Sequence, residues 1–116
     1  MARQPILERA IMDALWDSEG WLTTAEIRER LGHRVSLTTV GTVMGRLLRK
    51  GRVERRKSGR SYEYRAVRNR EEHLATQMEE LLDLSRDREL ALMRFIDRLP
   101  TADRSRLLRL LRRRGQ

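Results

Sequence analysis

Side chains that can donate hydrogen bonds and carry positive charge are concentrated in residues 36–60. A helix advances by about 100° per residue, so the hydroxyl groups of Thr38 and Thr42 fall on one helical face. Arg46 and Arg49 add guanidinium groups to the same face. Arginine matches the paired acceptors on the major-groove edge of guanine, and threonine can bond several bases. This face therefore suits contact with the base edges of duplex DNA.

A second group of cations follows in the same segment, on a predicted β-hairpin. These side chains would flank the groove and contact phosphates or the adjacent minor groove. The complete set of predicted DNA-binding residues is Ser36, Thr38, Thr39, Thr42, Gly45, Arg46, Arg49, Arg55, Arg56, Lys57 and Arg60.

Each of these assignments has a simpler alternative. The arginines can be cations on a solvated face. Gly41 and Gly45 each cost about 1 kcal/mol against alanine inside a helix, and they either let another surface approach the backbone closely or have no role. Tyr62 and Tyr64 alternate along a strand, which favours packing inside the hairpin over stacking on nucleobases.

Apolar periodicity predicts the elements that position this face. Helices are expected over residues 5–18, 24–31 and 37–49, and strands over residues 21–22, 52–57 and 60–66. The sequence TTAE at 23–26 has the form of a capping box, and Ser36 can cap the third helix. Apolar side chains in that helix recur at the spacing of one buried stripe: Val40, Val43, Met44, Leu47 and Leu48. Three helices, a short strand and a hairpin form a winged helix-turn-helix, which we assign to residues 1–69.

Residues 70–116 are predicted to form a helical dimerisation domain, so that the chain is mostly α with one small β-hairpin. Pro100 interrupts the helical pattern, and Thr101 can cap the last helix. These short helices carry more aliphatic surface than one copy can cover, and we expect a homodimer. The predicted dimer contacts are Leu74, Met78, Leu81, Leu82, Leu90, Met93, Phe95, Ile96, Leu107, Leu108 and Leu111.

Charge is shared unequally between the two predicted domains. The formal net charge is +9 and the isoelectric point about 11.3, which favours an anionic partner. Residues 1–70 carry 16 basic and 8 acidic side chains, whereas residues 71–116 carry 10 and 9. The excess positive charge therefore accompanies the predicted DNA-binding domain.

Several functional classes find no support in the residues. There are no cysteines, and His33 and His73 lack neighbours at metal-ligand spacing, so we expect neither a metal nor a cofactor. No nucleophile with its base and no phosphate-cradling glycine loop is present, which predicts a protein that is not an enzyme. Charges at Arg3, Glu8 and Arg9 interrupt the N-terminal apolar run, so we expect no signal peptide or membrane span, and a cytoplasmic location.

The sequence resembles the penicillinase-repressor (BlaI/MecI/CopY) family of bacterial transcription regulators. The segments that carry the resemblance are LERAIMDALW at 7–16, TTAEIRERL at 23–31, LTTVGTVMGRLLRKGRV at 37–53 and SGRSYEYRAV at 58–67. The resemblance implies a winged-helix domain, a helical dimerisation domain, and repression through an inverted-repeat operator. The positions that it implies to face DNA are Thr38, Thr39, Thr42, Arg46 and the wing residues near Arg60.

This chain departs from the family pattern at several positions. Leu37 stands where the family usually has a tyrosine, and glycine replaces bulkier residues at 41 and 45. The absence of cysteine excludes the copper-sensing branch. In the β-lactam branch a sensor protease cuts the repressor before a phenylalanine, and here Phe95 follows Arg94 in place of the usual asparagine. A sensor protease is a partner that the resemblance implies, and the arginine at position 94 argues against release by cleavage before Phe95.

Two other functional classes are compatible with a basic winged helix. One is an architectural factor that binds DNA or RNA without regard to sequence. The other is a winged helix that docks a protein. The polar, glycine-bearing and cationic face of the third helix argues against the second class.

Overall fold

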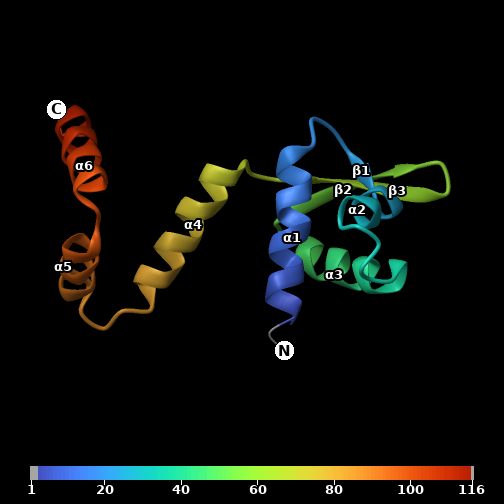
Figure 1. Ribbon diagram of the computed structural model, residues 1–116, viewed down its shortest axis with the longest axis horizontal. Helices are drawn as coiled ribbons and strands as arrows, with labels where there is room; N and C mark the ends of the chain where they lie inside the picture. Colours follow the sequence, from blue (N-terminus) through green and yellow to red (C-terminus); the bar gives the residue numbers. More distant parts are fainter. Residues whose placement is uncertain (1–2, 116) are drawn as a thin grey trace. The chain divides into compact units, whose positions relative to one another are not determined.

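The structure, a computed structural model, describes residues 3–115 of the chain and the side chains of residues 6–115 (Figure 1). The elements in order are α1 Arg3–Asp17, β1 Leu22–Thr23, α2 Thr24–Arg30, α3 Leu37–Arg49, β2 Val53–Ser58, β3 Ser61–Ala66, α4 Arg70–Asp83, α5 Arg88–Arg98 and α6 Thr101–Arg114. They fall into two units, Met1–Leu74 and Ala75–Gln116. The first unit is a winged helix-turn-helix, and the second is wholly helical in its described part.

The three strands form one antiparallel sheet in the order β1-β3-β2. Leu22 pairs with Tyr64, and Arg56 pairs with Glu63 across the hairpin. Gly59 occupies the hairpin turn with φ +63°, in the left-handed region that glycine enters without steric cost. The β2–β3 hairpin therefore consists of two six-residue strands, and the two-residue β1 pairs with β3 on the side away from β2.

Both helices of the helix-turn-helix begin at the predicted caps. Thr23 accepts a hydrogen bond from the Glu26 amide at 3.1 Å, and Glu26 accepts one from the Thr23 amide at 2.8 Å, which completes the capping box. Ser36 accepts from the Thr39 amide at 3.0 Å. These bonds satisfy amides that a helix start would otherwise leave unpaired. They fix where α2 and α3 begin.

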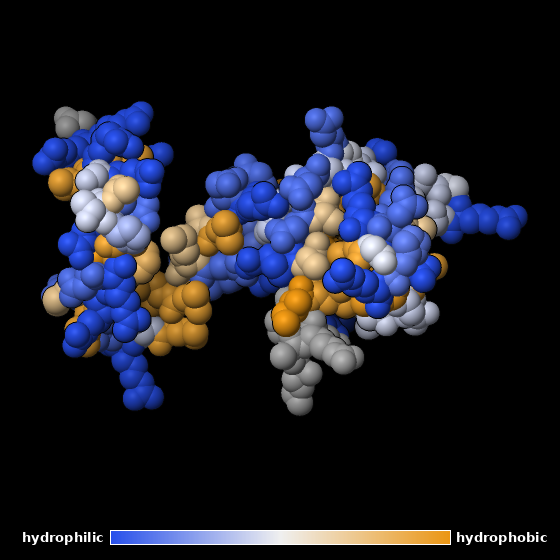
Figure 2. All heavy atoms as spheres, viewed as in Figure 1, coloured by the Kyte–Doolittle hydropathy of each residue, from blue (hydrophilic) through white to orange (hydrophobic). Residues whose placement is uncertain are grey.

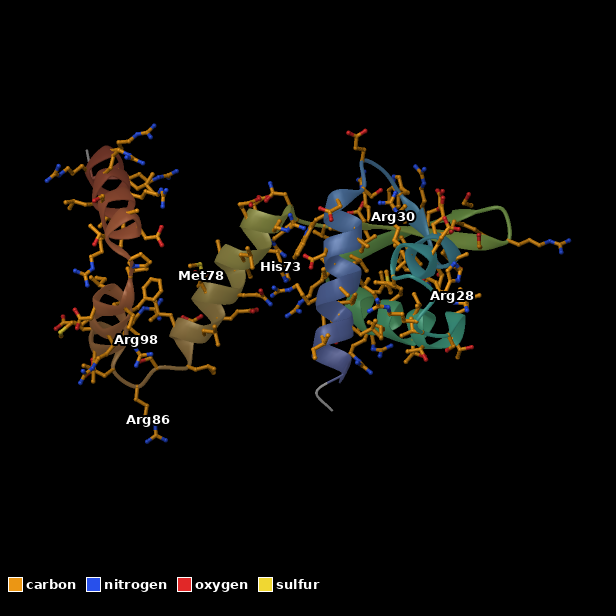
Figure 3. The ribbon with its side chains drawn as sticks, viewed as in Figure 1. Arg28, Arg30, His73, Met78, Arg86 and Arg98 are labelled. Carbon is orange, nitrogen blue, oxygen red and sulfur yellow. The ribbon has the colours of Figure 1, made fainter. Side chains whose placement is uncertain are left out.

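The turn between α2 and α3 uses two consecutive residues in the left-handed region. Gly32 has φ +77° and His33 has φ +60°. Arg28, labelled in Figure 3, donates from Nε to the Val35 carbonyl at 2.9 Å and so ties α2 to the end of the turn. The turn geometry sets the angle at which α3 leaves α2.

One hydrophobic core holds the first unit together. Every helix and strand from α1 to β3 contributes to it, and each fully buried side chain contributes roughly 1.5–3 kcal/mol relative to exposure. Its buried members are Ile11, Met12, Leu15, Leu22, Ile27, Val40, Val43, Met44, Leu47, Val53 and Tyr64. The buried stripe of α3 is thus confirmed, with Leu48 half-buried at its margin.

The first turn of α4 packs on α1 within the first unit. Trp16 donates from Nε1 to the Arg68 carbonyl at 3.0 Å, and its ring centroid lies 5.2 Å from that of His73, which is buried. Arg70 reaches Asp13 at 3.3 Å and Asp17 at 3.2 Å. The first unit accordingly extends to Leu74, beyond the boundary expected after residue 69.

The helices of the second unit are joined by specific polar contacts. Asp87 caps α5 by accepting from the Leu90 amide at 3.1 Å. Arg104 of α6 donates to the carbonyls of Ile96 and Asp97 at 3.1 and 2.9 Å, which closes the end of α5. The prediction that Thr101 caps α6 is wrong, because Thr101 is the first helical residue and Pro100 precedes it without a side-chain bond.

The described part of the second unit, residues 75–115, contains no buried side chain. Hydrophobic surface is visible on its helices in Figure 2, and Met78 is labelled on α4 in Figure 3. Its exposed large apolar side chains are Met78, Leu81, Leu84, Leu90, Leu92, Met93, Phe95, Ile96, Leu108, Leu110 and Leu111. The other predicted dimer contacts, Leu74, Leu82 and Leu107, are half-buried.

Candidate nucleic-acid interface

The outer face of α3 is polar and exposed. Thr38, Thr39 and Thr42 lie on it together with Gly41, while the opposite stripe of the helix is buried in the core. Because four fully buried side chains anchor α3, its outer face is held rigidly with respect to the rest of the first unit. A rigid polar helix face of this kind can enter a major groove without reorganising.

Some hydroxyl groups of this face already serve the helix. Ser36 donates from Oγ to Thr39 Oγ1 at 2.9 Å in addition to accepting from the Thr39 amide. Thr42 donates to the Thr38 carbonyl at 3.0 Å. Ser36 is therefore first a helix cap. The Thr42 oxygen still has lone pairs that can accept from an adenine or cytosine amino group.

The two glycines of α3 are not required by packing within the chain. A Cβ placed at Gly41 would meet nothing within 4 Å, and one at Gly45 would meet only the Arg49 guanidinium at 3.7 Å. Glycine at these positions leaves open space on the outer side of α3. That space allows a flat or convex partner to approach the helix backbone.

Arg46 and Arg49 differ in their surroundings. Arg49 is exposed, and no ion pair of this side chain occurs among residues 6–115. Arg46 is half-buried, and its Nη1 lies 3.5 Å from Oε2 of Glu8 on α1. The structure thus directs the Arg46 guanidinium toward the α1 side of the interface, whereas Arg49 faces solvent.

Glu8 is a functional candidate that the sequence analysis did not identify. Its carboxylate contacts three cations: Lys50 at 3.1 Å, Arg46 at 3.5 Å and Arg52 at 3.9 Å. One feature of the sequence could have identified it: Glu8 lies on α1 one turn before the buried Ile11 and Met12. A charged side chain in line with a buried apolar stripe needs a partner of opposite charge. We call Glu8, Arg46, Lys50 and Arg52 the Glu8 cluster.

The wing presents two different faces. Side chains alternate along β2, so Arg55 and Lys57 share the face of the buried Val53, and Arg56 lies on the other. Arg55 stacks on the Tyr62 ring with its Cζ 4.1 Å from the centroid. Tyr62 is 40% exposed because the hairpin extends beyond the core at this point, whereas Tyr64 is buried as expected.

The other face of the wing is largely neutralised. Arg56 lies 2.9 Å from Glu63, and Arg65 lies 2.9 Å from Glu54. The Cζ atoms of both arginines lie over the Trp21 ring, at 4.4 and 4.5 Å. Arg56 is therefore an already paired cation, in contrast to Lys57 and Arg60, for which no ion pair occurs in the part of the chain that the structure describes.

Within residues 3–115, no three His, Cys, Asp or Glu side chains come together in a way that could hold a metal ion. No helix of the described residues is long and apolar enough to cross a membrane.

The chain is similar to a protein family and to several known proteins. The family model described as Penicillinase repressor matches residues 6–113. The proteins called Transcriptional regulator BlaI from two strains of Mycobacterium tuberculosis are each 36% identical to this chain, over 90% of it and 80% of the relative. The crystal structure of Streptococcus pneumoniae FabT in complex with DNA has a TM-score of 0.48 at 20% identity, and the match covers 93% of this chain and 71% of that one.

Proposed function

This chain belongs to the penicillinase repressor family of DNA-binding transcriptional regulators, and we propose that it is a homodimeric repressor that occupies an inverted-repeat operator. In this proposal α3 is the recognition helix and the β2–β3 hairpin is the wing. The observation that carries it is the rigid outer face of α3, with exposed threonines, two unobstructed glycines and Arg49 on one side of a fully buried stripe.

We assign distinct tasks to the predicted DNA-binding residues. Thr38, Thr42 and Arg49 are proposed to contact base edges, since they lie exposed on α3. Lys57 and Arg60 are proposed to bind phosphates from the wing, together with Arg55. The residues that border this contact are Thr39, Gly45 and Arg46. Ser36 caps α3 and so fixes where the helix begins. Arg56 is neutralised by Glu63 and is proposed to contribute less to phosphate binding.

The exposed apolar surface of the second unit supports dimerisation. Eleven large hydrophobic side chains between Met78 and Leu111 are exposed in a single copy. So many exposed apolar side chains on a unit of 42 residues exceed what the surface of a monomer usually carries. Packing against a second identical copy is the simplest way to bury them. Two recognition helices related by a twofold axis would read half-sites centred about 34–36 Å apart.

A sensor protease remains a proposed partner. The bond before Phe95 lies inside α5, whose backbone is hydrogen-bonded as a helix. Proteases bind extended segments, so we propose that cleavage at this bond would require local opening of α5.

Selection of bound duplexes from a random pool tests the proposal. We expect an enriched inverted repeat with half-sites about one helical turn apart, and two chains per duplex by analytical ultracentrifugation. Tight binding without an enriched sequence would identify an architectural factor instead. Failure to bind any duplex at moderate salt would reject DNA binding altogether.

A further inference from the structure

We propose that Glu8 acts as an internal substitute for a DNA phosphate and lowers the affinity of the protein for duplex DNA of any sequence. This inference rests on the proposed DNA-binding function. It places on α1, outside the recognition helix and the wing, a residue that limits the electrostatic, sequence-independent part of DNA binding.

The first observation is the geometry of the Glu8 cluster. Lys50 Nζ lies 3.1 and 3.3 Å from the two carboxylate oxygens of Glu8, so the ammonium group bridges both. Arg46 and Arg52 approach at 3.5 and 3.9 Å. Three cations therefore converge on one carboxylate, as they would on the oxygens of a backbone phosphate.

The second observation is the difference in exposure between the carboxylate and its cations. The Glu8 side chain is 12% exposed, whereas that of Lys50 is 42% exposed. Glu8 is held on α1 by the buried stripe that follows it. Lys50 stands at the end of α3 on a flexible four-carbon stem and can turn from Glu8 toward a phosphate. A cation of the cluster can thus leave Glu8 and contact a DNA phosphate while the carboxylate stays in place.

The third observation is the charge balance. Three positive groups and one negative group leave the cluster with a net charge of +2. A phosphate that approaches must compete with Glu8 for the same cations and is repelled by it. Glu8→Gln removes the negative charge and leaves the cluster with a net charge of +3, while the side chain keeps nearly the same shape.

Glu8→Gln is the direct test, with Glu19→Gln as the matched control. Glu19 lies in the exposed α1–β1 connection and forms no ion pair among the described residues. Both variants gain one unit of positive charge. We expect Glu8→Gln to bind a random-sequence duplex about three- to tenfold more tightly than the control, with a steeper dependence of log K on log salt by about 1.

The same titrations with a duplex selected by the wild-type protein complete the test. We expect Glu8→Gln to gain a similar factor on this duplex, because every sequence presents the same phosphates to the cluster. Equal random-DNA affinities for the two variants would overturn the inference and leave the proposed function intact. Loss of affinity for the selected duplex alone would overturn it too, because Glu8 would then only position Arg46. Absence of any duplex binding by wild-type protein would reject both.

A double-mutant cycle separates this role from a structural one. In a Lys50→Gln background we expect the effect of Glu8→Gln on random-DNA affinity to shrink at least about twofold, because one of the released cations is missing. A full effect in that background would show that Glu8 does not act through Lys50. Thermal unfolding of each variant establishes that the titrated protein is folded.

Discussion

Adjacent cations on the wing differ in how much charge they can offer. Arg56 is paired with Glu63 and covers Trp21, whereas Lys57 points to the opposite face of the hairpin. A cation that is already paired must give up its partner before it gains a phosphate, so its net contribution is small. Sequence position alone does not distinguish the two.

This difference can be measured with two matched variants. We expect Lys57→Gln to weaken binding to selected and random duplexes alike and to reduce the salt slope by about 0.9, the value for one phosphate contact. We expect Arg56→Gln to change the slope by less than half of that. Fluorescence anisotropy over a salt series gives both slopes, and equal reductions would contradict the assignment.

His33 carries strain in the turn of the helix-turn-helix. Its φ of +60° is uncommon for a residue with a side chain. We expect His33→Val to lower the free energy of unfolding by about 1–2 kcal/mol, because a β-branched residue is poorly accommodated there. His33→Gly should not be destabilising to this extent. Urea denaturation of both variants checks the prediction, and equal losses would show that the turn tolerates any side chain.

Among the secondary-structure elements, α2 depends most on its first turn, because it has only seven residues. Hydrogen bonds from Thr23 to the Glu26 carboxylate lower the pKa of Glu26; the bond from the Thr23 amide has the larger effect and the bond from the Thr23 hydroxyl the smaller. A carboxylate with a lowered pKa stabilises the fold above its ordinary pKa, and this contribution is lost as pH falls through the lower, folded value. The capping box is therefore an acid-sensitive feature of the first unit.

Glu26→Gln isolates that contribution. Between about pH 6 and about pH 3, wild-type protein should lose the Glu26 part of its stability, whereas the variant has no carboxylate at this position to titrate. Glu29→Gln on the same helix is the control, and it should retain the wild-type pH dependence. Denaturant midpoints at both pH values give the comparison. A Glu26→Gln profile that matches the control would mean that the capping box does not contribute.

The helices and the hairpin were largely predictable, because each depends on local pattern. The stripe from Val40 to Leu47 and the caps Thr23 and Ser36 were recognisable in the sequence, and the structure confirms them. The predicted cap of α6, Thr101, is wrong because Pro100 occupies the N-cap position and Thr101 is the first helical residue. Periodicity places a helix well but resolves its first residue poorly.

The details of the interface were less predictable, because ion pairs between elements depend on tertiary geometry. The pairing of Arg46 with Glu8, 38 positions earlier in the chain, has no local signal. Alternation along β3 correctly puts Tyr62 and Tyr64 on one face. It does not show that the core ends between them.

For the chain as a whole, the proposed association of two copies links the two units to function. An operator with twofold symmetry can be read only if the second unit holds two copies together. Leu81 is 69% exposed on α4 and belongs to the stripe predicted from the sequence. Covering such side chains supplies the free energy of assembly.

Leu81→Glu should therefore disrupt the proposed dimer. Burying an unpaired carboxylate at this position is expected to raise the dimer dissociation constant at least about tenfold, which is about 1.4 kcal/mol. Glu80→Lys alters charge on the same helix but away from the stripe and should leave association nearly unchanged. Sedimentation equilibrium compares them. Dimers of undiminished strength for Leu81→Glu would place the interface elsewhere.

The positions of the two tryptophans have a practical consequence. Trp16 packs against His73 where α4 begins, and Trp21 lies beneath Arg56 and Arg65 on the back of the wing. The chain has only these two indoles, and both belong to Met1–Leu74. Light emitted on excitation at the red edge of the ultraviolet band thus reports on the N-terminal unit alone. The C-terminal helices stay dark, so a circular-dichroism transition that the fluorescence does not follow would report their melting.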